Sequence, residues 1–497
     1  DRIRNNSTLR IEYNLVPMIG HPASDNLYVS DLDNTDLSIK TSIGRIPAKS
    51  NEQIASYLAK LRDFESLKGK TGQWRKSMIQ LSGGSSLSEI NQFKSYLTSY
   101  YNIAKDSFLG ASRIVFAKDD DIPIQTSLEQ EIQGEINTGS VVLNYFGHGA
   151  AQALELSIGS VSTLNQSSIN SPLYIFNGCA LGITYEQSSL CEEFLFAESK
   201  GPLGWIASTN FGYSNSLFAH TMEITKSLFQ RKYGEGVGSA LKDALDFYNY
   251  PSNILSTLQA RQLNYLGDPA LVVTPINKPD YTPIKVASNY DYSLEENQFV
   301  LELENLGKYT SDTLKVILQL SSSDGTLLLS KIHSVSGFAS NKNIEFLVEK
   351  DLLENLVKIN IIVDSDNSIE EYGILGETNN QLEEEIYFEN NNVKILAPKL
   401  DDIITDNDLE LKFDFGFNST ELKSLIFEID TTKYFSSILL TSKITGKNSI
   451  LSKKIKIPFY DKTDFYIRYK LENTSEWQSS SFALILGDSP GKSQGDF

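Results

Sequence analysis

One histidine and one cysteine stand where they could act together. Residues 140–149, SVVLNYFGHG, form an apolar run that ends with His148 between two glycines, and the run SPLYIF leads through Asn-Gly to Cys179. A nearby imidazole can take the proton of a thiol and leave a thiolate, which is a strong nucleophile. The flanking glycines let the backbone adopt unusual dihedral angles and let a substrate chain approach closely. This pattern is typical of nucleophilic catalysis by a Cys–His pair.

Each residue also has a non-catalytic interpretation. A single histidine after a strand is often structural, and a single cysteine at a strand end is often a small buried apolar residue. Cys179 could instead form a disulfide with Cys191, the only other cysteine, but Cys191 falls on the apolar side of a predicted helix in SSLCEEFLFAES, which favours a packed thiol. Two cysteines without CxxC spacing leave too few soft ligands for a zinc site. The residues alone leave the catalytic and structural interpretations both open.

Alternating patterns up to about residue 276 predict the elements that position this pair. Ser50 with Gln53, and Ser86 with Glu89, have the spacing of capping boxes, each of which starts a helix. The second helix repeats apolar residues at helical spacing: Ile90, Phe93, Leu97 and Tyr100. Between the helices lie apolar runs that predict strands: SMIQLSGG, SRIVFAK, SVVLNYF, PLYIF and GWIAS. Such alternation implies a mostly parallel sheet covered on both faces, with ligands beyond the carboxyl ends of its strands.

The pattern changes after this region. Apolar and polar residues alternate from about 283 to 388, as in QFVLELENLG and VKINIIVDS, and again from about 391 to 497, as in LELKFDFGF. Alternating strands separated by turn residues are typical of β-sandwiches. The sequence therefore predicts an α/β domain at residues 1–276, a β-sandwich at 277–389 and a second β-sandwich at 390–497.

Charge and hydropathy exclude some functions. Asp and Glu outnumber Lys and Arg by 63 to 44, and the net charge of -19 argues against a nucleic-acid-binding surface, which is built mainly from Lys and Arg. No uninterrupted apolar stretch is long enough to be a transmembrane segment. The chain opens on Asp1 without an initiating Met, which we interpret as a portion of a longer protein.

Two acidic stretches space their oxygen ligands as calcium loops do. Neither has the turn glycine or the distal Glu of an EF-hand, and acidic turns are usually only solvated. The stretches are Asp31, Asp33 and Asp36, and Asp364, Asp366 and Ser368. Calcium is therefore the one cofactor the sequence suggests, and Cys–His chemistry itself requires none.

Around the candidate pair the sequence resembles the gingipain-type cysteine peptidases of the caspase-like clan. In that clan a His-Gly after one strand and a Cys after the next form the catalytic dyad. The family's Gly-Arg-(Ile/Phe)-Pro segment and helix are similar to SIGRIPAKSNEQIASYLAKLRDFE. Its nucleophile strand, helix and next strand are similar to PLYIFNGC followed by SLCEEFLFAESKGPLGWIAST, and its closing turn and strand are similar to YLGDPALVV. The resemblance covers nearly all of residues 15–276. It implies a caspase-like α/β fold whose first strand and helix lie upstream of Asp1.

The resemblance also implies roles for particular residues. By position, His148 becomes the general base and acid and Cys179 the nucleophile, with the backbone N–H groups of Gly149 and Cys179 as the oxyanion hole. Two such donors stabilise the charge of a tetrahedral intermediate. Residues that follow GWIAS fall where family members line the primary specificity pocket: Thr209, Asn210 and Tyr213.

Two acidic positions of the family are absent from this sequence. Gingipains carry one acidic residue after the strand that matches SMIQLSGG, where it orients the histidine, and another that gives a preference for basic side chains. Here those places read Gly83-Gly84-Ser85, and Glu89 is the nearest acid. The comparison therefore predicts that His148 lacks a carboxylate partner, and it predicts no preference for Arg or Lys.

LVPMIGHPASDNLYVSD, the motif FNGC and the two β-domains are most similar to the sortase-like branch associated with the type IX secretion system of Bacteroidetes-type bacteria. The second domain resembles an immunoglobulin-like module, and the third resembles fibronectin-like domains. The resemblance implies an exported enzyme at the cell surface, associated with the outer membrane. Such an enzyme removes the C-terminal signal domain of protein cargo and joins the cargo to surface lipopolysaccharide, with outer-membrane secretion subunits as partners.

Two other functions remain open. A degenerate, inactive family member could hold cargo or bridge subunits of the secretion machinery, and the missing acid favours that alternative. A free secreted endopeptidase is the third interpretation.

Overall fold

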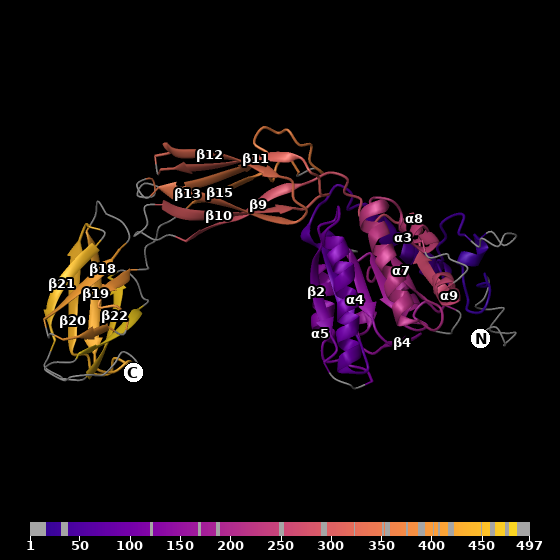
Figure 1. The fold of residues 1–497 in the computed structure, drawn as a ribbon, viewed down its shortest axis with the longest axis horizontal. Coiled ribbons are helices and arrows are strands. Elements are labelled where there is room, and N and C mark those ends of the chain that lie inside the picture. The colour runs from indigo at the N-terminus through magenta and orange to yellow at the C-terminus, as the bar shows by residue number, and fades with distance from the viewer. Residues whose placement is uncertain are drawn as a thin grey trace.

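The computed structural model describes most of the chain. The described residues are 16–30, 38–119, 123–166, 170–184, 189–247, 253–289, 296–322, 324–349, 352, 358–373, 376–385, 393–400, 402–405, 408–415, 422–448, 450–457, 463–472 and 477–484. Figure 1 shows an α/β domain followed by two all-β domains. In the part of the chain described here, no helix combines the length and the apolar character that crossing a bilayer requires.

A six-stranded sheet forms the centre of the first domain. Its order is β2 (Ser112–Ala117), β1 (Ser77–Ser82), β3 (Val142–Phe146), β6 (Leu173–Asn177), β7 (Gly204–Ser208) and β8 (Leu263–Gly267). The first five strands are parallel to one another, and β8 pairs antiparallel with β7. The predicted mostly parallel sheet is therefore confirmed.

Helices flank this sheet, and their apolar faces form the main core with it. They are α3 (Asn51–Glu65), α4 (Leu87–Lys105), α5 (Glu129–Thr138), α6 (Leu190–Phe196), α7 (Ser214–Lys226), α8 (Val237–Phe247) and α9 (Ile254–Gln262). Short helical turns lie at η1 (Asn26–Tyr28), η2 (Gln73–Arg75), η3 (Val161–Thr163) and η4 (Ser227–Arg231). Helix α4 packs on β1, β2 and β3 and beside α7, whereas α3 packs beside α6.

At both predicted capping boxes the serine caps its helix, and the side chain three residues later accepts the N–H of the residue before the serine. Ser50 Oγ accepts the N–H of Gln53 at 3.3 Å at the start of α3, and Ser86 Oγ accepts the N–H of Glu89 at 3.3 Å at the start of α4. The apolar positions predicted for α4 are all buried: Ile90, Phe93, Leu97 and Tyr100. Because α4 begins directly after β1, its first turn lies at the carboxyl edge of the sheet.

Strand β2 is more exposed than the sequence predicts. Its apolar run suggested a strand covered on both faces, but Val115 is 42% exposed. Among the described strands, β2 lies at the edge of the sheet and pairs with β1 alone, so its other side is not covered by a described strand.

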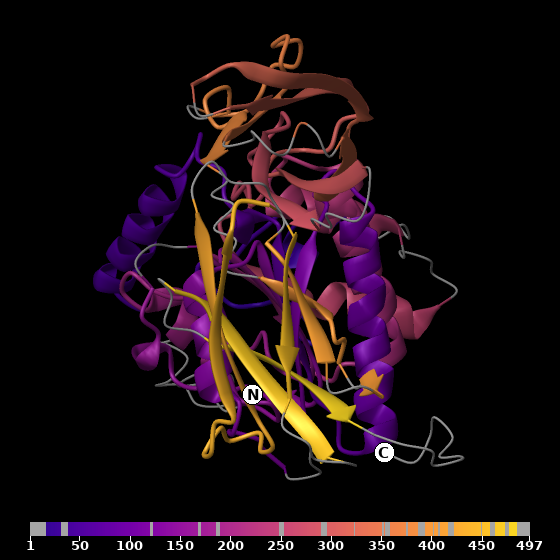
Figure 2. The ribbon, with the colours of Figure 1, turned by 90° about the vertical axis from the view of Figure 1, so that its left-hand side faces the viewer.

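Each all-β domain pairs two sheets around its own core. The second domain consists of β13-β10-β9 and β12-β11-β14-β15, and the third of β16-β18-β21 and β17-β23-β22-β19-β20. The strands of the second domain are β9 (Tyr281–Asn289), β10 (Glu296–Asn305), β11 (Thr313–Ser321), β12 (Leu327–Ser336), β13 (Asn341–Glu349), β14 (Lys358–Val363) and β15 (Gln381–Glu385). Figure 2 views the molecule from the third domain, whose strands are β16 (Lys394–Ala397), β17 (Asp402–Ile404), β18 (Asp408–Asp414), β19 (Lys423–Asp430), β20 (Leu440–Gly446), β21 (Ile450–Lys456), β22 (Thr463–Leu471) and β23 (Gln478–Leu484). The two predicted β-sandwiches are therefore confirmed.

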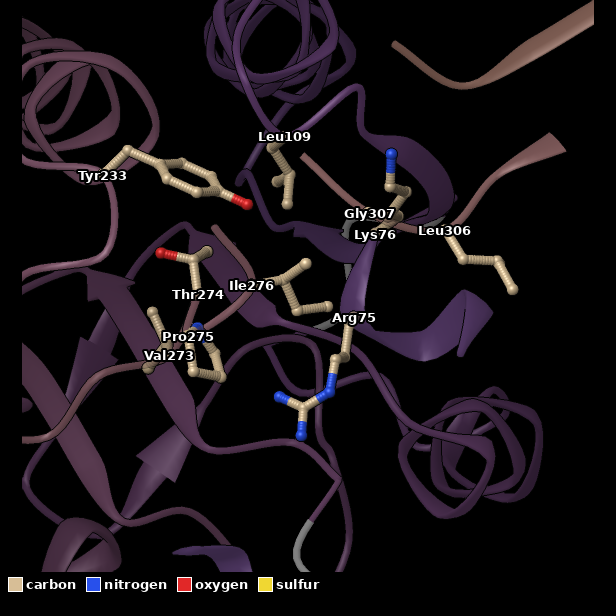
Figure 3. Close-up of a pocket in the computed structure, with 10 residues that line it drawn as sticks. All are labelled: Arg75, Lys76, Leu109, Tyr233, Val273, Thr274, Pro275, Ile276, Leu306 and Gly307. Carbon is tan, nitrogen blue, oxygen red and sulfur yellow. The ribbon is translucent and has the colours of Figure 1, made fainter. Parts of the chain in front are cut away.

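The first two domains contact each other directly. Lys76 donates from Nζ to the carbonyl oxygen of Ala339 at 2.6 Å, and the carbonyl of Phe108 accepts the N–H of Tyr309 at 2.9 Å. Figure 3 shows a small cavity at this junction, lined by residues of both domains that include Arg75, Leu109, Tyr233, Ile276, Leu306 and Gly307. These contacts tie the second domain to the end of the sheet opposite the carboxyl ends of its parallel strands, because Lys76 directly precedes β1.

A buried carboxyl group, that of Glu371, lies in the part of the chain that follows β14 and precedes β15. Glu371 is 6% exposed, and its Oε2 accepts the N–H of Tyr281 at 2.9 Å. Burial raises the pKa of Glu371 to about 8; the Tyr281 hydrogen bond opposes this rise, and the charges of Asp280, Glu377 and Asp364 add to it. At neutral pH the folded protein therefore keeps a proton on this group.

The change Glu371→Gln is expected to flatten the pH dependence of stability in the second domain. The folded protein holds this proton up to about pH 8, whereas an unperturbed carboxyl releases it near 4.5. The wild type therefore loses stability as the pH rises through this window, by about 2 to 5 kcal/mol, and the amide variant should not lose that part. Amide hydrogen exchange in β9 and β14 at pH 5 and pH 8 measures the difference. The exposed neighbour Glu370 is the matched control, and equal slopes for Glu371→Gln and the wild type would contradict the assignment.

Candidate active site

Strands β3 and β6 are neighbours and lead to the histidine and the cysteine at one edge of the sheet. Their register places Phe146 opposite Asn177, and the N–H of Gly147 donates to the carbonyl of Asn177 at 3.0 Å. His148 and Cys179 each lie two residues beyond that last pair. The structure therefore brings both residues to the carboxyl ends of adjacent parallel strands.

A tight turn holds Cys179. Its thiol is free and partly buried, and the sulfur accepts the N–H of Gly212 at 3.3 Å. The next residue, Ala180, has a φ of 60°, which is uncommon for a residue other than glycine, and its N–H donates to the carbonyl of Asn210 at 2.9 Å. Among hydrogen bonds between described residues, none uses the Cys179 N–H as donor. Gly149, the other predicted oxyanion donor, begins the hairpin of β4 (Gly149–Ala150) and β5 (Ala153–Leu154).

The second cysteine is separate from this turn. Cys191 lies in α6, is completely buried and has a free thiol, so no disulfide joins it to Cys179. Burial raises the pKa of Cys191 to about 12, so its thiol stays protonated at neutral pH. The prediction of a packed thiol is confirmed.

His148 has a carboxylate partner, which corrects the prediction that it lacks one. Its Nε2 lies 3.0 Å from Oε2 of Glu89. Partial burial raises the pKa of Glu89, but hydrogen bonds from the N–H of Ser85 and from His148 outweigh burial and hold the pKa below its ordinary value. Glu89 is therefore ionised at neutral pH. The comparison of sequences missed it because the acid lies not in the loop after β1 but in the first turn of α4, which carries residue 89 back over the same edge.

The glycines beside the histidine are required by close protein contacts. A Cβ at Gly147 would lie 2.4 Å from the Tyr145 hydroxyl and 2.7 Å from Glu155 Oε1. A Cβ at Gly149 would lie 2.8 Å from a methyl group of Leu181. The sequence suggested that these glycines make room for a substrate, whereas at these two positions the structure shows that the protein's own side chains fill the room.

The change Gly147→Ala is expected to destabilise the first domain by about 1 to 3 kcal/mol, because the methyl group displaces two buried side chains. Peptide cleavage should fall as well, since the next residue is His148. Thermal unfolding and a cleavage assay measure both effects. Gly134→Ala in α5 is the control: a Cβ there meets nothing within 4 Å, so this helix should gain stability. An unchanged melting temperature for Gly147→Ala would contradict the steric argument.

The predicted pocket residues follow β7 but face different surroundings. Thr209 is completely buried, and its hydroxyl donates to the carbonyl of Ala23. Tyr213 is 46% exposed, and its N–H donates to Gln259 Oε1 at 3.0 Å. The Thr209 side chain therefore binds the backbone at Ala23, whereas the side chain of Tyr213 is partly exposed to solvent.

The loop from Asn210 to Tyr213 does contact the cysteine turn. Asn210 binds that turn through its carbonyl, and Gly212 binds the Cys179 sulfur. Between them, Phe211 is 71% exposed and was not predicted. An exposed aromatic ring in the loop that contacts the thiol is a surface that an apolar group could contact. The one signal for Phe211 in the sequence is its position between the predicted pocket residues Asn210 and Tyr213.

The structure describes only one of the two predicted calcium-binding stretches. Asp31, Asp33 and Asp36 lie outside the described residues. In the other stretch, the Asp364 carboxylate accepts the N–H groups of Ser368 at 3.2 Å and Ile369 at 3.0 Å, and Asp366 pairs with Lys315 at 2.6 Å. Among the described residues, no group of three or more His, Cys, Asp or Glu side chains is placed to hold a metal ion.

Comparison with known proteins identifies the first domain's relatives. Residues 2–274 match the sequence model for peptidase family C25. No match was found among curated proteins. Among solved structures, the chain is similar to the Arg-specific cysteine proteinase gingipain R, with 16% identity and a TM-score of 0.45, over 75% of this chain and 81% of that chain.

Two further similarities are to proteins of Porphyromonas gingivalis. A complex of the RgpB pro- and mature domains matches with 16% identity and a TM-score of 0.45, over 75% of this chain and 83% of that chain. Dimeric latent PorU matches with 12% identity and a TM-score of 0.15, over 59% of this chain and 32% of that chain.

Proposed function

Because the chain belongs to peptidase family C25, we propose that it is a cysteine peptidase in which Cys179 attacks a peptide carbonyl and His148 moves the proton. One observation supports this most strongly: His148 is bonded to the ionised Glu89 at the same sheet edge as a free, partly exposed thiol. A carboxylate on one imidazole nitrogen fixes the orientation and tautomer of the ring and stabilises the imidazolium. Since Glu89 occupies Nε2, Nδ1 is the nitrogen that exchanges the proton with Cys179.

The reaction proceeds through an acyl-enzyme. His148 accepts the thiol proton, and the Cys179 sulfur forms a bond to the carbonyl carbon. The N–H groups of Gly149 and Cys179 stabilise the oxyanion, and loss of one such donor costs about 3 to 4 kcal/mol in comparable sites. His148 then gives its proton to the departing amine, and the downstream part of the substrate leaves. The acyl group finally passes from sulfur to water or to an acceptor amine.

We propose that the substrate is exported cargo of a type IX secretion system. The segment LVPMIGHPASDNLYVSD, the motif FNGC and the two β-domains support a sortase-like role. In this role the enzyme works at the outer-membrane surface beside secretion subunits, removes the C-terminal signal domain and transfers cargo to an amine of surface lipopolysaccharide. We expect no preference for Arg or Lys at the cleaved bond. The chemistry requires no cofactor, and calcium bound at Asp31, Asp33 and Asp36 would take no part in the reaction.

An acceptor-competition experiment tests transfer against hydrolysis. Purified protein is incubated with cargo that carries its signal domain, with and without added lipopolysaccharide bearing a free amine. A transpeptidase should yield more amine-linked cargo and less hydrolysed cargo as the acceptor concentration rises, because the acceptor amine competes with water for the acyl-enzyme, and the rate of signal release should be unchanged or higher. Release of the signal domain without any amine-linked product would leave a peptidase and remove the sortase role.

The scaffold alternative has lost its main support. It rested on the missing carboxylate partner of His148, and Glu89 supplies that partner. A protein that only binds cargo has no chemical need for an ionised carboxylate on an imidazole at the same sheet edge as a free thiol.

A further inference from the structure

A single buried carboxylate joins the loops that follow β1, β2 and β3. Glu155 lies directly after β5, and its side chain is 6% exposed. Its Oε1 accepts the N–H of Gly84 at 2.5 Å and the N–H of His148 at 2.7 Å. Its Oε2 lies 3.6 Å from Nζ of Lys118, which is 1% exposed and also donates to the carbonyl of Gly84 at 3.2 Å. No part of the reaction described above uses Glu155.

The strand order explains why a side chain is needed at this place. The chain runs from β1 to β2 on one side and then returns to β3 on the other side of β1. Loops that leave adjacent strands in opposite directions open a crevice between them, and Glu155 fills this one. The neighbouring glycines accommodate it, because a Cβ at Gly83 would lie 2.2 Å, and one at Gly147 2.7 Å, from Glu155 Oε1. The carboxylate therefore accounts for glycine at both loop positions.

The contacts of this carboxylate form a closed ring with the proposed catalytic pair. Glu155 holds Gly84, and the next residue, Ser85, donates its N–H to Glu89 Oε2 at 2.7 Å. That same oxygen lies 3.0 Å from Nε2 of His148, and the main-chain N–H of His148 returns to Glu155. Glu155 thus holds both the backbone of the histidine and the loop that positions its partner.

The charge of Glu155 matters as well as its shape. An ionised acceptor makes hydrogen bonds about twice as strong as a neutral one. Lys118 balances that charge in a nearly dry setting, and a buried ion is stable only when it is paired. A neutral amide at position 155 could still reach both N–H groups, but it would hold them more weakly and leave Lys118 unpaired.

We infer that Glu155 is a positioning residue for the reaction: it holds His148 and Glu89 at the spacing that proton exchange with Cys179 requires. It acts through other residues and does not touch the substrate. The inference rests on the proposed peptidase function and adds the part of the protein that sets the geometry of the site.

The full chain with Glu155→Gln tests this role. Because a displacement of the order of 1 Å can cost about 100-fold, kcat should fall about 10- to 100-fold while KM changes less than about twofold. Alkylation of Cys179 by iodoacetamide, which requires no substrate, should slow by a similar factor. The exposed carboxylate Glu193 supplies the matched control, because Glu193→Gln makes the same chemical change outside the ring and should alter neither rate.

A double variant separates positioning from charge balance. In Glu155→Gln with Lys118→Met no buried ammonium is left unpaired, so the melting temperature should recover while kcat stays low. If kcat recovers together with the melting temperature, charge balance alone explains the effect of Glu155→Gln, and the inference is overturned. An unchanged kcat in the single variant Glu155→Gln would also overturn it. If the wild type neither cleaves cargo nor alkylates faster than its His148→Ala variant, the proposed function fails, and the role of Glu155 fails with it.

Discussion

Replacement of Cys179 by Ala should lower cleavage of the signal domain by at least about 10⁴-fold, because it removes the sulfur that forms the acyl-enzyme. The fold should persist, since the sulfur is only partly buried and, among the described residues, its one hydrogen bond comes from the N–H of Gly212. Cleavage is followed by the change in cargo mass, and circular dichroism checks the fold.

The second thiol provides the control for this variant. Cys191→Ala removes a sulfur of the same kind from a completely buried position in α6. It should lower stability by roughly 1 kcal/mol and leave the cleavage rate unchanged. Unchanged cargo processing in Cys179→Ala would favour the scaffold that binds cargo or bridges secretion subunits without turnover.

Replacement of Glu89 by Gln should lower kcat by about 100-fold or more, because a neutral amide on Nε2 of His148 no longer stabilises the imidazolium and allows the wrong tautomer. The start of α4 should survive, since Gln also serves at this position of a capping box. The amide oxygen can still accept the N–H of Ser85, which Glu89 now accepts at 2.7 Å. Steady-state kinetics and thermal unfolding, measured together, separate the two roles.

Gln53, at the equivalent position of α3, provides a control for the effect of such a change on helix stability. Gln53 accepts the N–H of Lys49 at 2.6 Å, and no hydrogen bond between described residues joins its side chain to the site. Gln53→Ala should cost about 1 kcal/mol or less and leave kcat unchanged. A Glu89→Gln variant that keeps kcat would show that the Glu89–His148 contact supports the helix only.

The main elements of the site could be predicted from sequence because the signals are local. Apolar runs that end in Gly-His-Gly and Asn-Gly-Cys identify two buried strands. Because the carboxyl ends of parallel strands lie at the same edge of a sheet, both motifs are expected at that edge. The capping boxes placed the starts of α3 and α4, and the buried thiol of Cys191 followed from helical spacing.

The partners of His148 could not be predicted in the same way because they depend on how loops fold back over the edge. Glu89 was recognised as a helix-capping residue, yet whether its carboxylate also reaches the imidazole depends on the angle between α4 and β1. Glu155 lies seven residues after the histidine and carries no motif. Its one signal was indirect: Gly83 and Gly84 stood where the family carries an acid. The structure shows that this part of the site holds the side chain of another acid instead.

In the proposed reaction the sulfur of Cys179 carries the acyl group of the cargo. Cargo bearing its signal domain is mixed with the protein, quenched in acid during turnover, digested and analysed by mass spectrometry. We expect the peptide containing Cys179 to gain the mass of the upstream cargo fragment, and we expect the Glu89→Gln variant to accumulate this adduct more slowly. Release of the signal domain with Cys179 unmodified at every time point would contradict an acyl-enzyme at this residue.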